Sequence, residues 1–373
     1  MLLQVNLLLI NPEPAPRQSQ TYHYKFTGVP TDKNGVPLPP NTPPPPQFDD
    51  NKDPWYPFED EGGFCLADFL YCEEETPAKK NHYLLGIWAL DKAKHDNLVP
   101  FNSYAQIYNA INSIELGDAP WQSFLMTFAD DSNNLADTPW KTASYKVWYY
   151  DPAQVISNML DNPDFDGQFD YAAYVETQIY EDDNATKGCM PCPVILGSNK
   201  TTVSIATGYV EYHLLYLLFS NIHNTVRCAH RNAVVPIGFL AIPKRDWKYD
   251  NDTTFRKFKQ ELYHTSLLCI LQPLKAGMKI PVIQQCPDGH FHWVIYELAA
   301  FISDYPKQVA LAGVVQGWCP KCTGINKDLD GPSGPHTQSL IKQFINSAKG
   351  DGTVLWDLYR IDDNILPFTH NFP

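Results

Sequence analysis

Apolar positions in the second half of the chain fall into short runs with the length and composition of β-strands. Each run is bounded by glycine, proline or polar residues, which is typical of strand ends. The runs are Pro193–Leu196, Val203–Ala206, Leu214–Ile222, Ala233–Ile242 and Val294–Ile302. Asp252–Met278 has the apolar spacing of a long helix, and Pro306–Gln316 has that of a shorter one. Successive strands, a helix, another strand and a helix predict an α/β fold.

The first half of the chain predicts shorter elements after a proline-rich leader. Residues 11–53 are dominated by Pro, Asp and Asn, so we expect an extended, solvated segment that does not pack. Trp121–Phe128 and Tyr145–Tyr150 have the composition of strands. Asp151 and Pro152 are residue types preferred at a helix N-cap and first helical position, so a helix is expected to begin there.

The composition favours a folded chain without a bulk attraction for nucleic acid. Hydrophobic residues make up 44% of the 373 residues, which is enough for a sizeable core. The net charge of −14 gives no overall attraction to DNA phosphates. One local stretch is nevertheless basic, and it could either meet DNA phosphates or form a solvated helix face and loop. Its members are Arg227, His230, Arg231, Lys244, Arg245, Arg256, Lys257 and Lys259.

The hydropathy pattern predicts neither a membrane span nor a secretion signal. No stretch reaches the roughly eighteen consecutive apolar residues that a span requires. Met1–Ile10 is apolar, but it lacks a basic region before it and a small-residue cleavage pattern after it. We therefore expect a nuclear or cytoplasmic location, and not a secreted one.

Two polar groups directly follow predicted strands, which is where open α/β sheets place their sites. They are Asn199 and Asp304. Taken alone, polar residues at strand ends are more often caps or turns than site residues. Cys319 and Cys322 have the spacing of a metal knuckle, but a structural zinc ion needs four ligands. A half-built zinc site and two free thiols are therefore equal alternatives for this pair.

Several segments together resemble the core of the Plavaka-type transposases, a group related to the CACTA-type elements. The segments are Trp148–Tyr174, Pro193–Gly208, Ala229–Pro243, Cys286–His290, Asp304–Cys322 and Leu366–Thr369. The likeness extends from about Pro54 to the end of the chain. It implies an RNase H-like mixed-sheet core whose family chemistry is DNA strand cleavage and transfer. We accordingly predict a disordered leader over 1–53, a helical or mixed region over 54–174, a partial RNase H-like core over 175–322 and an incomplete C-terminal segment over 323–373.

The resemblance also implies a metal site, but this chain lacks some of the carboxylates that form it in the family. In the family, carboxylates from separate strands hold two divalent ions, Mg²⁺ or Mn²⁺, that activate the attacking oxygen and stabilise the leaving one. The first carboxylate falls at Asn199, the second at Asp304, and the third beyond Leu366–Thr369, where this chain has no counterpart. An amide brings no charge to two dications, so we expect neither competent metal binding nor strand transfer.

The sequence therefore predicts a transposon-derived pseudoenzyme that binds DNA weakly through the basic stretch. Two alternatives stay open at this point. One is a non-catalytic module that binds DNA or chromatin, and the other is a metal-dependent nuclease completed by a partner. Zinc at Cys319 and Cys322 is a separate possibility.

Overall fold

The computed structural model describes the chain in discontinuous ranges. They are 25–45, 55–56, 58–69, 101, 103–112, 119–129, 138–172, 186–204, 210–229, 231–244, 247–249, 251–324, 333–347, 355–356, 360–361 and 367–372. The chain divides into two compact units, one formed by residues 1–45 with 121–373 and the other by residues 46–120. This division differs from the predicted boundaries after residues 53 and 174. The reason is that β1, β2 and β3, all upstream of residue 174, belong to the large sheet.

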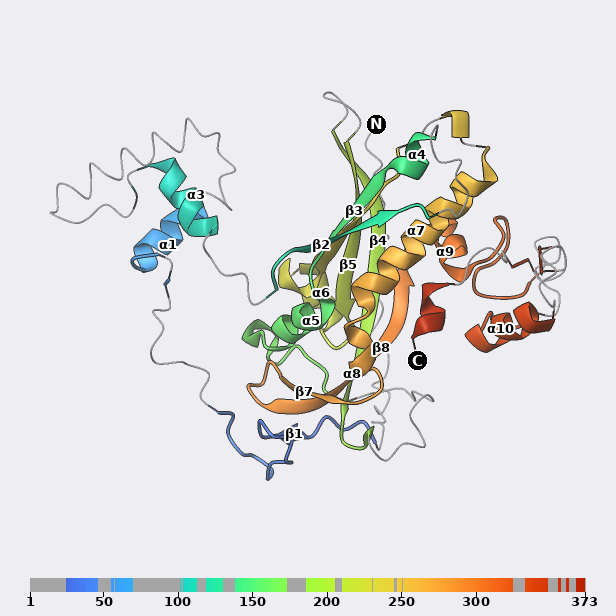
Figure 1. The fold of residues 1–373 in the computed structure, drawn as a ribbon. Helices are drawn as coiled ribbons and strands as arrows, with labels where there is room; N and C mark the ends of the chain where they lie inside the picture. The colour runs from blue at the N-terminus through green and yellow to red at the C-terminus, as the bar shows by residue number, and fades with distance from the viewer. Residues whose placement is uncertain are drawn as a thin grey trace, which may run out of the picture. The chain divides into compact units, whose positions relative to one another are not determined.

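The larger unit is built on an eight-stranded mixed sheet (Figure 1), which confirms the α/β class. The strand order is β1-β8-β4-β5-β6-β3-β2, and β7 also pairs with β8. β4 and β8 are parallel, whereas the other neighbouring strands are antiparallel. The strands are β1 Pro30–Thr31, β2 Gln122–Thr127, β3 Ser144–Tyr149, β4 Met190–Ser204, β5 Val210–Phe219, β6 Val235–Leu240, β7 Val282–Gln285 and β8 Phe291–Ile302.

β4 joins two runs that the sequence predicts as separate strands. The intervening residues are polar, yet the pairing with β5 continues through Thr202. A polar stretch can extend a strand in this way because its backbone is hydrogen-bonded even where its side chains are not buried. The exposed end of β4, which includes Asn199 and Lys200, therefore projects beyond the apolar core.

Helices cover the sheet and connect its strands. The helices are α4 Pro139–Thr142, α5 Pro152–Leu160, α6 Asn224–Ala229, α7 Thr253–Leu271, α8 Leu274–Gly277, α9 Tyr305–Ala312 and α10 Gln338–Ser347, with 3₁₀ turns η2 Pro163–Phe165, η5 Arg231–Ala233, η6 Trp247–Tyr249 and η8 Phe368–Asn371. α5 begins as predicted, because the carboxylate of Asp151 accepts from the backbone N–H of Ala153. No helix in the described part of the chain has the length and apolar content that a membrane span requires.

α7 lies across one face of the sheet (Figure 1). Phe255, Phe258 and Leu262 pack with Trp140 and Tyr145 in one apolar cluster. The predicted helix over Asp252–Met278 is divided in two after α7, where proline, which lacks an N–H group, precedes α8. The long helix is thus fixed to the sheet by aromatic packing.

Residues 25–45 pack against the β7–β8 hairpin, in contrast to the solvated leader predicted there. β1 pairs with the beginning of β8. Nδ1 of His292 lies 3.1 Å from the carbonyl oxygen of Gly28, and the indole N–H of Trp293 donates to the carbonyl of Gly35 at 2.9 Å. A proline-rich segment has few N–H donors, but its carbonyls can still accept from side chains of the hairpin. The rest of the predicted leader lies outside the described residues.

The described part of the smaller unit contains two helices, within the region that the sequence predicts as helical or mixed. They are α1 Glu61–Asp68 and α3 Tyr104–Asn112. Phe58, Ala67, Phe101 and Ile107 form a separate apolar cluster of buried side chains. This unit therefore has a core of its own.

Candidate functional site

Asn199 and Asp304, the two predicted site residues, lie at the same edge of the sheet. The last paired residues of the parallel strands β4 and β8 are Gly197 and Ile302. Asn199 is two residues beyond this pair in β4, and Asp304 is two residues beyond it at the start of α9. Both residues are exposed. The fold thus brings the two chain positions to one edge.

Asp304 stands at the N-terminus of α9 without capping the helix through its side chain. Its backbone carbonyl accepts from the N–H groups of Lys307 and Gln308, but its carboxylate makes no capping hydrogen bond. The carboxylate is instead close enough to act electrostatically on His213, Tyr263 and Lys307. These three groups lie on the side of the sheet that faces α7.

Asn199 points to the opposite side of the sheet from these groups. Successive side chains of a strand alternate between the two faces. Ser198 points toward α7, because its hydroxyl lies 2.9 Å from Nε2 of His213. Lys200 is directly opposite His213 in the pairing of β4 with β5 and so shares that face. Asn199 and Asp304 therefore share a sheet edge without sharing a pocket.

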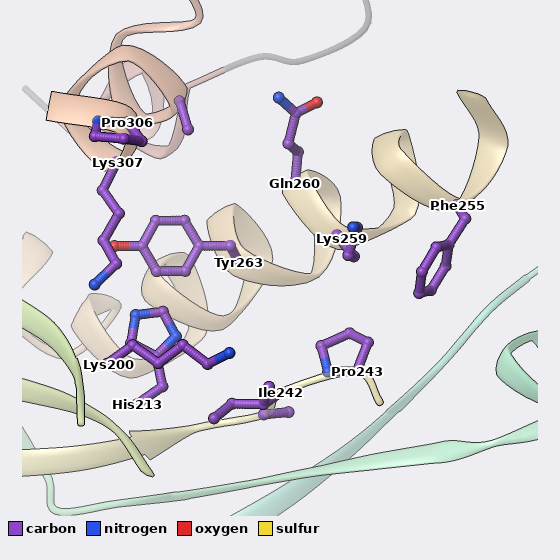
Figure 2. A pocket seen from close by; sticks show the side chains of 12 residues that line it. Lys200, His213, Ile242, Pro243, Phe255, Lys259, Gln260, Tyr263, Pro306 and Lys307 are labelled. Atoms are coloured by element: carbon purple, nitrogen blue, oxygen red, sulfur yellow. The ribbon is translucent and has the colours of Figure 1, made fainter. Parts of the chain in front are cut away.

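A cleft of about 470 Å³ lies between α7, α9 and the ends of β4 and β5 (Figure 2). Three lysines line it, Lys200, Lys259 and Lys307, and the described lining residues include no carboxylate. The ring of Tyr263 stacks on that of His213, with centroids 5.4 Å apart and planes inclined by 5°. Figure 2 shows Lys307 reaching from α9 past Tyr263 toward His213. The other lining residues are Ala241, Ile242, Pro243, Phe255, Gln260, Pro306 and Ala310.

Burial determines the protonation of the groups at the base of the cleft. Burial lowers the pKa of His213 to about 4, with Lys307 and Lys200 acting in the same direction and Asp304 opposing them. Burial also lowers the pKa of Lys307, an effect that Asp304 opposes and Lys200 reinforces. Burial raises the pKa of Tyr263 to about 12. Near neutral pH the base of the cleft is therefore a neutral imidazole on a neutral phenol.

The groups at this edge do not fit a pair of divalent metal ions. Such a pair requires several anionic oxygens, whereas Asn199 offers an uncharged amide and Asp304 a single carboxylate. Glu211 is already ion-paired with Lys200. Lys200 and Lys307 add positive charge in the same region, which disfavours a dication. Within the described ranges, no three His, Cys, Asp or Glu side chains are grouped in a way that could hold a metal.

Cys319 and Cys322 form a close pair of thiols. Burial raises the pKa of Cys319, but hydrogen bonds from the Cys322 thiol and from the backbone N–H of Lys321 outweigh it, so the pKa is below its usual value. The backbone N–H of His336 donates to the carbonyl of Lys321 at 2.9 Å, which brings this histidine near the pair. Zinc binding by the two cysteines stays a prediction.

Two members of the predicted basic stretch on α7 have different surroundings. Lys259 lines the cleft, where its ammonium lies 4.7 Å from the ring centroid of Phe255. Lys257 instead lies 3.9 Å from the carboxylate of Glu261 on the same helix. Two members fall outside the described residues: His230 and Arg245. Lys259 therefore faces the cleft, whereas Lys257 does not line it.

Sequence reasoning missed His213, Tyr263 and Lys307 in the cleft. Lys307 follows Asp304 by three residues, so the first turn of α9 returns it to the same edge, and this spacing is a usable signal. His213 is a lone histidine in an apolar strand, a pattern that gives no indication of a site.

Most of the chain matches a known protein family. A family model described as Plavaka transposase matches residues 101–373. The matched range contains every strand of the sheet except β1, both edge positions and all the residues that line the cleft. No curated protein matches the chain.

Proposed function

Because the chain belongs to the Plavaka transposase family, we propose that it is a transposon-derived protein that contacts DNA without transferring strands. The family supports a transposase-like origin and DNA as the partner. The loss of chemistry is the finer part of the proposal. It depends on one observation, the amide of Asn199 at the position where the resemblance places the first metal-binding carboxylate.

The electrostatic cost of this amide is large. A missing unit charge about 4 Å from a cation removes about 4 kcal/mol for each cation at an effective dielectric constant of about 20. Lys200 and Lys307 act in the same direction, because each adds a positive charge near the same edge. The remaining carboxylate, that of Asp304, cannot compensate for both effects.

We further propose that the large sheet is an RNase H-like core. β4, which carries the first of the implied site positions, lies in the interior of the sheet, and β8, which leads to the second, is its parallel neighbour. Neighbouring parallel strands end at the same edge. This supports a fold that brings site positions from separate strands to one edge of the sheet, although their side chains point to different faces.

A cleavage assay on branched and linear DNA with Mg²⁺ or Mn²⁺ tests the loss of chemistry. We expect no metal-dependent nicking by the full chain. We also expect none from Asn199→Asp, because this side chain points to the opposite face of the sheet from the groups on which Asp304 acts. Robust nicking by the unaltered chain would overturn the proposal. Nicking gained by Asn199→Asp alone would show that the remaining ligands are present after all.

DNA contact is tested separately by titrating the affinity with salt. We expect the logarithm of the affinity to fall linearly with the logarithm of the salt concentration, because phosphate contacts release counterions. A nuclear or cytoplasmic location agrees with such a role. An affinity without a salt slope would remove the phosphate-contacting surface from the proposal.

A further inference from the structure

Three ammonium groups from three different elements face the same cleft. Lys200 comes from β4, Lys259 from α7 and Lys307 from α9. Lys200 is ion-paired with Glu211, but both side chains are more than a third exposed, and such surface pairs are weak. Among the described residues, Lys259 and Lys307 have no carboxylate within ion-pair distance. The cleft therefore carries an excess of positive charge in a protein whose net charge is −14.

The positive charges of Lys200 and Lys307 repel each other in the cleft. Burial lowers the pKa of Lys307, and the nearby charge of Lys200 lowers it further although Asp304 opposes this. In the part of the chain that the structure describes, the ammonium of Lys307 has one hydrogen-bond contact, a long one of 3.4 Å to the carbonyl oxygen of Ser198. An anion placed between the lysines would relieve both the repulsion and the incomplete hydrogen bonding.

We infer that this cleft binds a phosphate group of a polynucleotide directly, without a divalent metal ion. The inference rests on the proposed function in one respect, namely that DNA is the partner. Lysine binds phosphate as a point charge, and three lysines face this cleft while its described lining has no carboxylate to repel a phosphate. The neutral His213 and Tyr263 at the base add no negative charge to oppose the phosphate.

The position and size of the cleft agree with this ligand. It opens on the face of the sheet that carries Ser198 and Lys200, and its lysines supply positive charge there. A volume of about 470 Å³ holds a phosphate with the attached sugar. The bound phosphate would therefore lie against the lysines with no ion between them.

The test measures the affinity of the full chain for a labelled oligonucleotide in the presence of EDTA. We expect binding to persist in the chelator. Lys259→Gln and Lys307→Gln should each weaken it by roughly threefold to tenfold and should each reduce the salt slope by roughly 0.7 to 0.9. Lys275→Gln is the control for Lys259→Gln, because it removes the same charge from α8, outside the cleft and outside the basic stretch. Lys279→Gln, outside the cleft after α8, is the control for Lys307→Gln.

Inorganic pyrophosphate distinguishes the polynucleotide from a small phosphate ligand. We expect it to compete with the oligonucleotide only at concentrations far above those of the nucleic acid, because it makes a single local contact. If the cleft variants weaken pyrophosphate binding but leave oligonucleotide binding unchanged, the polynucleotide assignment is overturned.

Different results would overturn this inference and the proposed function. Cleft variants that bind the oligonucleotide as tightly as their controls, or binding that EDTA abolishes, would overturn the direct phosphate site and leave a DNA-binding, non-cleaving protein intact. Metal-dependent nicking would overturn the proposed function whatever the lysine variants do. Thermal unfolding of each variant, monitored by circular dichroism, confirms that a lost affinity is not a lost fold.

Discussion

His213 makes the larger unit sensitive to acid at the scale of one residue. Burial and the neighbouring lysines lower its pKa from 6.5 to about 4, so the unfolded chain binds the proton first as the pH falls. The stability that this group contributes is complete above about pH 6.5 and is lost as the pH falls toward 4. We expect this residue alone to cost about 2 kcal/mol of unfolding free energy between about pH 7 and pH 5.

Urea unfolding of His213→Gln at the two pH values measures this effect. Glutamine can still hydrogen-bond with the Ser198 hydroxyl, which lies 2.9 Å from Nε2 of His213, but it does not titrate. The variant should therefore lose about 2 kcal/mol less than the unaltered chain on acidification. Ser198→Ala is the control, because it removes the hydrogen bond and keeps the titrating ring. An equal acid loss in His213→Gln and the unaltered chain would contradict the prediction.

The site positions show what can be predicted at this scale. The shared edge of Asn199 and Asp304 was predictable because each follows an apolar run, although β4 continues past Asn199 to Ser204. The cleft residues were not predictable, since His213 and Lys259 meet only after β5 and α7 have packed together. Side-chain direction was also hidden, because the face to which Asn199 points depends on the register of β4 with β5.

At the scale of elements, the β7–β8 hairpin holds residues 25–45 through a cluster centred on Asp288. Its carboxylate lies 3.2 Å from Nδ1 of His290 and 3.1 Å from Nε2 of His292. The second nitrogen of each histidine faces a backbone carbonyl of residues 25–45, that of Thr42 at 2.9 Å and that of Gly28 at 3.1 Å. Burial raises the pKa of Asp288, but its hydrogen bonds with the histidines outweigh this and lower it.

Asp288→Ala should release this segment. His292 is only 1% exposed, so its Nε2 would be left buried without its carboxylate partner, at a cost of about 1–3 kcal/mol. We expect faster proteolysis and faster hydrogen exchange within residues 25–45. Asp60→Ala is the matched control, because that aspartate caps α1 in the smaller unit. Unchanged protection of residues 25–45 in Asp288→Ala would show that β1 pairing alone holds the segment.

Elements held by interactions between residues close in sequence were predictable, whereas packing that depends on residues far apart in sequence was not. α5 was predictable because Asp151 and Pro152 define its start within two residues. The packing of residues 25–45 was not predictable, since the donors that satisfy its carbonyls lie about 260 positions later in the chain. A proline-rich composition shows that a segment lacks donors, but it does not show whether distant side chains supply them.

At the scale of the whole molecule, we predict that the two compact units fold independently of each other. The smaller unit has its own buried cluster, and residues 1–45 and 121–373 form the other unit around the sheet. We expect a chain in which a flexible glycine–serine linker replaces residues 46–120 to keep the unfolding midpoint and the oligonucleotide affinity of the larger unit. The physical reason is that an insertion with its own core contributes little to the stability of its host. Differential scanning calorimetry should show one transition fewer, with the remaining one unshifted. If the sheet unfolds in the shortened chain, residues 46–120 are part of its cooperative unit and the division is only geometric.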